Sequence, residues 1–213
     1  MMQPQLVIFD FDGTLADSLP WVRSVFDDVA RRWGFRPLSA GDDQALRQMR
    51  TDALLRYLGV PGWKIPLIAA DMRRRMSRDI HVIQLFPGVA SMLEQLAAAG
   101  PRLGIVSSNA TGNIKQVLGA RLWGLLHYTE CGAGIAGKHR RLTRLLRRAR
   151  VQPQHAIYIG DEIRDIDAAR RAGTAAGAVA WGCNPAQTLA HQRPDLLFLR
   201  VHDIASRLLA VPA

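Results

Sequence analysis

The chain has 213 residues, a formal net charge of +10 and a hydrophobic fraction of 48%. This length accommodates one sizeable core with a smaller appended unit, and the hydrophobic fraction is that of an ordinary globular protein. No segment approaches the roughly 20 apolar residues of a membrane span. The N-terminus leads directly into an apolar run, so we expect no signal peptide and no membrane partner. Cys131 and Cys183 form neither a disulfide framework nor a metal-ligand pattern, which favours a cytoplasmic protein.

The first predicted element is a short buried strand that ends in two carboxylates. Residues 6–9 form an apolar run typical of a buried strand, and Asp10 and Asp12 follow it directly. Side chains two residues apart leave a strand on the same side, so these carboxylates can share one site. Crowded carboxylates repel each other unless a cation or a proton intervenes, and Mg²⁺ is usually held by one or two carboxylates. The alternative interpretation is a strand that ends in an Asx turn without a ligand.

The segment between this strand and Phe86 has a helical pattern throughout. Apolar residues recur at helical spacing over 22–33, over 46–58 and over 65–76, and Ser39 can cap the second of these regions. Crossover helices of the core are one interpretation. Three helices are too many for one crossover, so the pattern favours a separate all-helical insertion.

From Phe86 onward, predicted strands and helices alternate. This alternation predicts a doubly wound, mostly parallel sheet, whose ligands bind beyond the carboxyl ends of the strands. Asp10, Ser107 and Asp161 all occupy such ends. The predicted elements are a helix over 89–96, a strand over 103–107, a helix over 113–118, a strand over 128–131, a helix over 138–150, a strand over 156–160, a helix ending at Gly173, a strand over 176–180, an edge strand over 196–199 and a final helix through 204–208.

A second acidic cluster follows the strand at 156–160. Asp161 stands at the strand end, and Asp165 lies four residues later, where a helix begins. Glu162 is either a further metal-site acid or a solvent-exposed residue at the helix start, and we favour exposure. Two acidic clusters at strand ends indicate a preformed metal and phosphate site.

The densest positive charge lies in the predicted helix over 138–150. Its leucines form one face, and its arginines form the opposite, solvated face: Arg140, Arg141, Arg144, Arg147 and Arg148. No aromatic residues are interleaved with these arginines, as a single-strand binding groove requires. We therefore expect a surface helix docked on the sheet and no nucleic-acid partner.

Four short motifs occur in this order along the chain: Asp10-Phe11-Asp12-Gly13-Thr14-Leu15, Ser107, Lys138, and Gly160-Asp161 with Asp165. Together they resemble the four motifs of the haloacid-dehalogenase-like hydrolase superfamily. Leu15-Ala16-Asp17-Ser18 and Phe86-Pro87-Gly88-Val89 are similar to its phosphoglycolate-phosphatase-like branch. The resemblance implies a Rossmann-like catalytic core formed by residues 1–17 and 84–213, with a helical cap at 18–83. It also implies a Mg²⁺-dependent phosphatase that hydrolyses a small phosphomonoester through an aspartyl-phosphate.

The resemblance assigns roles to individual residues. It implies that Asp10 is the nucleophile and that Asp12 is the general acid and base. Mg²⁺ would be bound by Asp10, by the backbone carbonyl of Asp12 and by Asp161, with Asp165 in support. Ser107 and Lys138 would hold the phosphate. Ser108 can take the place of Ser107 if the strand ends one residue later, and Asn109 follows in the same turn.

The cap is expected to read the rest of the substrate. Arg47, Arg50 and Thr51 lie at a break between helical patterns, where a loop can reach the site. The expected partner is a small phosphorylated metabolite, such as phosphoglycolate or a sugar phosphate, bound by a monomer or a homodimer. A phosphomutase would keep the same motifs, and a non-catalytic binding protein that retains the site is the alternative from another class.

Overall fold

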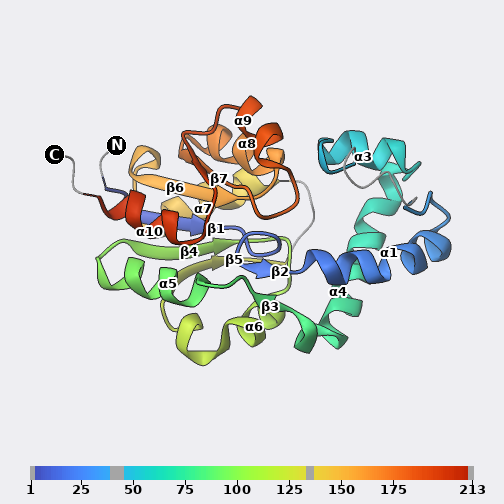
Figure 1. The fold of residues 1–213 in the computed structure, drawn as a ribbon, viewed down its shortest axis with the longest axis horizontal. Coiled ribbons are helices and arrows are strands. Elements are labelled where there is room, and N and C mark those ends of the chain that lie inside the picture. Colours follow the sequence, from blue (N-terminus) through green and yellow to red (C-terminus); the bar gives the residue numbers. More distant parts are fainter. Residues whose placement is uncertain (1–2, 39–45, 133–136, 211–213) are drawn as a thin grey trace.

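The computed structural model describes residues 3–38, 46–132 and 137–210 (Figure 1). Its centre is a six-stranded sheet in the order β5-β4-β1-β6-β7-β8, and every neighbouring pair is parallel. This arrangement confirms the predicted doubly wound parallel sheet. The strands are β1 (Leu6–Phe9), β4 (Arg102–Val106), β5 (Leu126–Glu130), β6 (Ala156–Gly160), β7 (Ala175–Val179) and β8 (Leu196–Phe198).

Helices cover both faces of the sheet, and the central strand β1 shows why. Its residues are fully buried and alternate between the faces: Leu6 and Ile8 belong to one hydrophobic cluster, and Val7 and Phe9 to the other. The cluster around Val7 and Phe9 includes side chains of α5 (Val89–Ala98), α6 (Thr111–Trp123) and α10 (His202–Leu209). The cluster around Leu6 and Ile8 includes side chains of α7 (Lys138–Ala149), α8 (Ile163–Ala172) and α9 (Ala186–His191).

The segment between β1 and α5 forms a helical cap beside the sheet (Figure 1). It contains α1 (Leu19–Trp33), α3 (Thr51–Tyr57), α4 (Ile65–Arg78) and the short 3₁₀ helices Gly62–Lys64 and Ile80–Val82; a third 3₁₀ helix, Pro153–His155, precedes β6. The helical insertion is therefore confirmed. The predicted capping role of Ser39 lies outside the described residues.

Two indole groups tie the first cap helix to the end of the cap and to α4. Trp21 donates its Nε1–H to Asp79 at 2.9 Å, and Trp33 donates its Nε1–H to Asp71 at 3.0 Å. Lys64 adds a hydrogen bond of 2.7 Å to the Trp33 carbonyl. These contacts fix the cap helices relative to one another.

A short ribbon joins the cap to the core. β2 (Ala16–Asp17) pairs antiparallel with β3 (Gln84–Leu85), so the chain leaves and re-enters the core through adjacent segments. The ribbon was not predicted, because two residues carry no readable period. We propose that it marks the boundary between the core, residues 1–17 and 84–213, and the cap at 18–83.

One helix face differs from the prediction. Arg141 was placed on the solvated face of α7, but only 8% of it is exposed and its Nη1 donates to the Ser107 carbonyl at 3.0 Å. The physical reason is that this carbonyl lies where β4 ends and needs a donor. None of the described helices is long and apolar enough to cross a membrane.

Candidate active site

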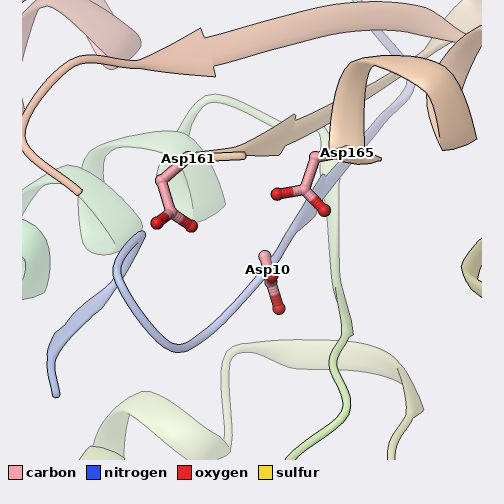
Figure 2. Close-up of side chains that lie close together, drawn as sticks. All are labelled: Asp10, Asp161 and Asp165. Atoms are coloured by element: carbon pink, nitrogen blue, oxygen red, sulfur yellow. The ribbon is translucent and has the colours of Figure 1, made fainter. Parts of the chain in front are cut away.

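Three buried carboxylates meet at the carboxyl ends of β1 and β6. Asp10 follows β1, Asp161 follows β6, and Asp165 lies in the first turn of α8 (Figure 2). Each offers an oxygen within 4.8 Å of the oxygens of the other two. The Glu162 backbone N–H donates to Asp165 at 3.0 Å, which completes a capping box at the start of α8. The fold thus gathers three oxygen ligands from distant parts of the chain.

The electrostatics of this cluster favour a cation. Burial raises the pKa of Asp10, although the charge of Lys138 partly offsets this effect. Burial, together with the charges of Glu162 and Asp165, raises the pKa of Asp161 well above its usual range. A hard divalent cation binds such carboxylates well, because its positive charge compensates their buried negative charge. The donor set therefore fits Mg²⁺.

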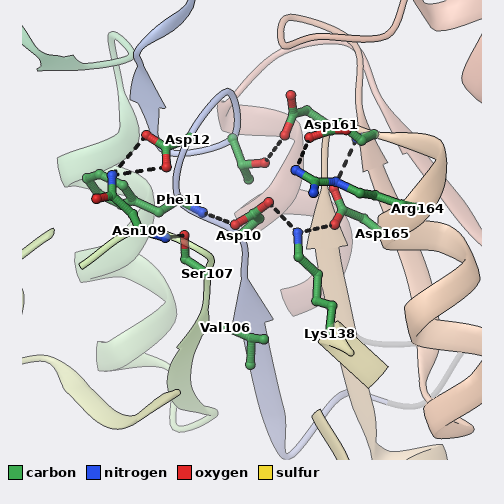
Figure 3. A network of polar contacts seen from close by, with 12 residues as sticks. Asp10, Phe11, Asp12, Val106, Ser107, Asn109, Lys138, Asp161, Arg164 and Asp165 are labelled. Carbon is green, nitrogen blue, oxygen red and sulfur yellow. Dashed lines mark hydrogen bonds and ion pairs between the residues drawn. The ribbon is translucent and has the colours of Figure 1, made fainter. Parts of the chain in front are cut away.

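Lys138 pairs directly with two carboxylates of this cluster. It is 6% exposed, and its Nζ donates to Asp10 at 2.6 Å and also to Asp165 (Figure 3). Burial alone would lower the pKa of Lys138, but the charges of Asp10 and Asp165 outweigh burial and raise it. Lys138 thus stays charged at the N-terminus of α7, a position that disfavours cations unless anions are near.

Asp12 lies in a different environment from Asp10. Its two carboxylate oxygens accept hydrogen bonds from the Asn109 Nδ2 at 3.1 and 3.0 Å (Figure 3). Burial and the negative charge of Asp10 raise the pKa of Asp12 to about 6. A carboxyl group with this pKa can hold a proton near neutral pH and release it again, which suits a general acid and base.

The turn after β4 contains the predicted residues Ser107, Ser108 and Asn109, and the two serines have different surroundings. Ser107 is fully buried, and its Oγ accepts a hydrogen bond from the Asn109 backbone N–H at 3.1 Å. Ser108 and Asn109 line a cavity of about 360 Å³ together with Asp12 and Asp161. Ser108 thus faces the cavity that Asp12 faces, while the Ser107 hydroxyl orders the turn. Both remain candidates for the phosphate contact.

A loop after β7 that was not predicted to take part in the site holds Asp161 in place. The Cys183 backbone N–H donates to Asp161 at 2.8 Å, and the Thr14 hydroxyl donates to it at 2.9 Å. The approach is close: a Cβ at Gly13, where φ is +73°, would lie 2.2 Å from an Asp161 oxygen, and a Cβ at Gly182 would lie 2.3 Å from the Gly13 carbonyl. Only glycine fits these positions. The sequence feature that could have indicated this loop is Gly182, which follows the strand predicted over 176–180 in the same sheet.

A family model described as haloacid dehalogenase-like hydrolase matches residues 7–179. The chain belongs to this family. The hydrolase is 38% identical, over 201 residues, to a phosphoglycolate phosphatase from Synechococcus elongatus, and the match covers 94% of this chain and 95% of that protein.

Other matches carry different names. A solved structure described as a putative phosphoglycolate phosphatase from Lactobacillus plantarum superposes with a TM-score of 0.82 at 27% identity, covering 97% of this chain and all of that one. A protein named tyrosine-protein kinase PtkA from Mycobacterium tuberculosis is 30% identical over 84% of this chain, which spans 63% of that protein. The hydrolase therefore lies in the phosphoglycolate-phosphatase-like branch and is a phosphoric monoester hydrolase.

The predicted cap residues of the hydrolase contact the core. Arg47 donates its Nε–H to the Cys183 carbonyl at 2.9 Å and its Nη2 to the Gly182 carbonyl at 2.6 Å. Arg50 forms an ion pair of 2.6 Å with Asp167 on α8. The predicted break is present at Arg50, which is extended, but Thr51 already begins α3, and the helical region predicted over 46–58 is interrupted here. The loop does reach the core, but these two guanidinium groups bind protein acceptors there.

Asn184 completes this contact between cap and core. It is 3% exposed, accepts a hydrogen bond from the Ile163 backbone N–H at 2.9 Å and donates to the Arg47 carbonyl at 2.6 Å. One buried amide thus joins the start of α8 to the cap loop. Nothing in the sequence distinguished this asparagine from an ordinary turn residue.

Glu162 is half-buried, which corrects the expectation that it is solvent-exposed. The Thr51 hydroxyl donates to it at 3.0 Å, and the Arg164 Nη2 donates to its other oxygen. The reason is tertiary, because the cap descends on the start of α8 and covers this side chain. Thr51 also lines the cavity, a position that is compatible with its predicted contact to the substrate.

Proposed function

We propose that this phosphatase hydrolyses a small phosphomonoester by a Mg²⁺-dependent route through an aspartyl-phosphate on Asp10. The observation that carries the proposal is the contrast between two carboxyl groups at one strand end. Asp10 is buried and ion-paired with Lys138, whereas Asp12 has a pKa of about 6 and borders the cavity. One group is suited to attack and the other to proton transfer.

In the first step, a carboxylate oxygen of Asp10 attacks the phosphorus atom and the bond from phosphorus to the ester oxygen breaks. Asp12 donates its proton to the departing alkoxide, so the leaving group departs as an alcohol. Lys138 offsets part of the effect of burial on the pKa of Asp10 and reduces the repulsion between this carboxylate and the phosphate. Asn109 orients Asp12 through its two hydrogen bonds.

In the second step, Asp12 accepts a proton from a water molecule, and the water oxygen attacks the phosphorus of the acyl phosphate. The bond from phosphorus to the Asp10 oxygen breaks, which releases inorganic phosphate and restores the carboxylate. Because the same Asp12 gives a proton in one step and takes one in the next, a pKa near the working pH serves both.

Asp10, Asp161 and Asp165 would hold Mg²⁺, with the Asp12 backbone carbonyl as a further ligand. When bound, the ion supplies positive charge that stabilises the equatorial oxygens of the transferring phosphoryl group. Ser107 or Ser108 would donate a hydroxyl hydrogen bond to the same oxygens.

The substrate is proposed to be a small phosphorylated metabolite, with phosphoglycolate first among the candidates. The support is the match along nearly the whole chain to a protein named for that substrate. A phosphomutase would use the same carboxylates, and phosphate release separates the two activities. A binding protein would not need an ion-paired Asp10 beside an Asp12 with a raised pKa.

The test is phosphate release from a panel of phosphorylated metabolites, measured with Mg²⁺ and with a chelator. We expect Mg²⁺-dependent release that includes 2-phosphoglycolate, and loss of this release in Asp10→Asn. Release that persists in that variant would overturn the proposed nucleophile. Isomerisation of a sugar phosphate without release would indicate the mutase.

A further inference from the structure

Arg164 has buried donors for which the described protein supplies no partner. The residue lies on α8 between Ile163 and Asp165, and its Nη2 donates to Glu162. Its Nε and Nη1 are buried and make no hydrogen bond. Figure 3 shows the side chain running from α8 toward the acidic cluster.

The unpaired donors of Arg164 belong to a charged group. Burial alone would lower the pKa of Arg164, but the charges of Glu162, Asp165 and Asp10 outweigh burial and raise it. The group is therefore charged, yet its Nε and Nη1 are buried and have no hydrogen-bond partner among the described residues. Such buried donors are rare in folded proteins, because each one left unpaired is destabilising. A ligand that accepts hydrogen bonds from them would remove this cost.

The position of Arg164 indicates which part of a ligand it would meet. The cavity that contains Asp12 and Ser108 adjoins a second cavity of about 570 Å³ that leads between the cap helices. Arg164 lines both cavities, as does Arg73 of the cap helix α4. The walls that the two cavities share are otherwise Thr51, Leu55, Ile65 and Ala69.

Arg73 gives this position a second cation. It is half-buried, and among the described residues its guanidinium group makes no ion pair or hydrogen bond. Arg73 comes from the cap and Arg164 from the core, so an anion between them would contact both units. The apolar side chains around the pair lower the local dielectric constant, which strengthens an interaction between arginine and an anion.

We propose that Arg164 and Arg73 bind a second anionic group of the substrate, a carboxylate or a phosphoryl group, on the leaving-group side of the scissile bond. This inference rests on the proposed function. Asp12, which protonates the leaving group, borders the first cavity, and the arginines lie where that cavity continues into the second. Arg47 and Arg50 are less suited to this role, because their guanidinium groups already bind Gly182, Cys183 and Asp167.

The test measures binding without turnover. In the Asp10→Asn protein with Mg²⁺, calorimetry compares three phosphomonoesters of similar length: 2-phosphoglycolate with a carboxylate, ethane-1,2-diol bisphosphate with a second phosphoryl group, and 2-hydroxyethyl phosphate with a neutral end. We expect at least one anionic ester to bind about tenfold or more tightly than the neutral one, as for one charge-assisted contact. The better of the two identifies the anion.

The arginines are then replaced in the same background. Arg164→Gln and Arg73→Gln should each reduce this preference by about tenfold, because each removes a charge-assisted contact. The matched control is Arg74→Gln, an exposed neighbour on α4, which should keep the preference. Arg73→Gln keeps the test decisive if the Arg164 variant fails to fold.

Two outcomes would overturn the inference. One is a protein that binds all three esters equally. The other is an equal loss for charged and neutral esters in both variants, which would place the arginines on the transferring phosphoryl group or assign them to the fold. If the wild-type protein released no phosphate from any ester, the proposed function would fail, but the binding preference would still decide the role of Arg164.

Discussion

At the scale of single residues, the site depends on burial and neighbouring charges, which give chemically identical carboxyl groups different properties. Asp10 and Asp12 are two residues apart, yet Lys138 pairs with one and Asn109 with the other. The result is a carboxyl group paired with a buried cation beside a second one whose pKa is raised to about 6. The neighbours of each carboxylate, rather than the residue type, define its role.

This contrast predicts the behaviour of Asp12→Asn. General acid–base catalysis is typically worth about 10²–10⁴-fold, so kcat for a natural alkyl ester should fall by that amount. An activated aryl ester such as p-nitrophenyl phosphate should lose less, because its leaving group needs little protonation. Steady-state kinetics on both esters checks this expectation. Equal losses would contradict the role of Asp12 as the acid that protonates the leaving group.

The sequence predicted the acidic residues because strand ends and glycine turns mark them. It could not predict the burial of Arg141 and Glu162 or the unpaired buried donors of Arg164. The burial of Arg141 depends on a carbonyl at the end of β4, and that of Glu162 depends on the approach of the cap. Such contacts come from residues far away in the chain, so local periodicity carries no trace of them.

At the scale of elements, the buried strands were readable from short apolar runs and the helices from their apolar faces. β1, β4, β6 and β7 lie within a residue of their predicted bounds. The elements that were missed are short ones, namely β2, β3, the three 3₁₀ helices and α9. Two to six residues hold too little pattern to identify such elements, and their formation depends on tertiary contacts.

The loop after β7 also predicts an effect on the stability of the fold. Asn184→Ala would leave the Ile163 N–H and the Arg47 carbonyl without their partner. One buried unpaired group costs about 1–3 kcal/mol, which in a protein of this size corresponds to a fall in Tm of about 2–12 °C. Thermal unfolding measures it. The exposed Gln95→Ala is the control, and an unchanged Tm in Asn184→Ala would contradict the role of this amide.

At the scale of the whole molecule, the site is shared between the core and the cap. The core supplies the carboxylates and Lys138, while the cap closes the cavity and contacts the core through Arg47, Arg50 and Thr51. The sequence predicted both units and their order. It could not show how closely they meet, because that contact is formed by side chains and carbonyls of unrelated segments. The cytoplasmic location and the monomer or homodimer remain predictions.

Metal binding should be visible as a gain in stability. Mg²⁺ at ten times its Kd should stabilise the protein by about 1.4 kcal/mol, or raise Tm by about 3–6 °C. Because the pKa values of Asp10 and Asp161 are raised, protons compete with the metal and the increase should shrink as pH falls. Thermal unfolding with and without Mg²⁺ tests this. Asp161→Asn should abolish the increase and the exposed Asp28→Asn should keep it; an increase retained in Asp161→Asn would contradict the site.

The most direct test of the central claim is chemical trapping of the acyl phosphate. The wild-type protein is quenched during turnover of 2-phosphoglycolate with Mg²⁺, reduced with borohydride and digested, and the peptide that contains Asp10 is analysed by mass spectrometry. Borohydride reduces an aspartyl-phosphate to homoserine, so we predict homoserine at position 10 that depends on substrate. Turnover with an unmodified Asp10, or with homoserine at another aspartate, would contradict the account.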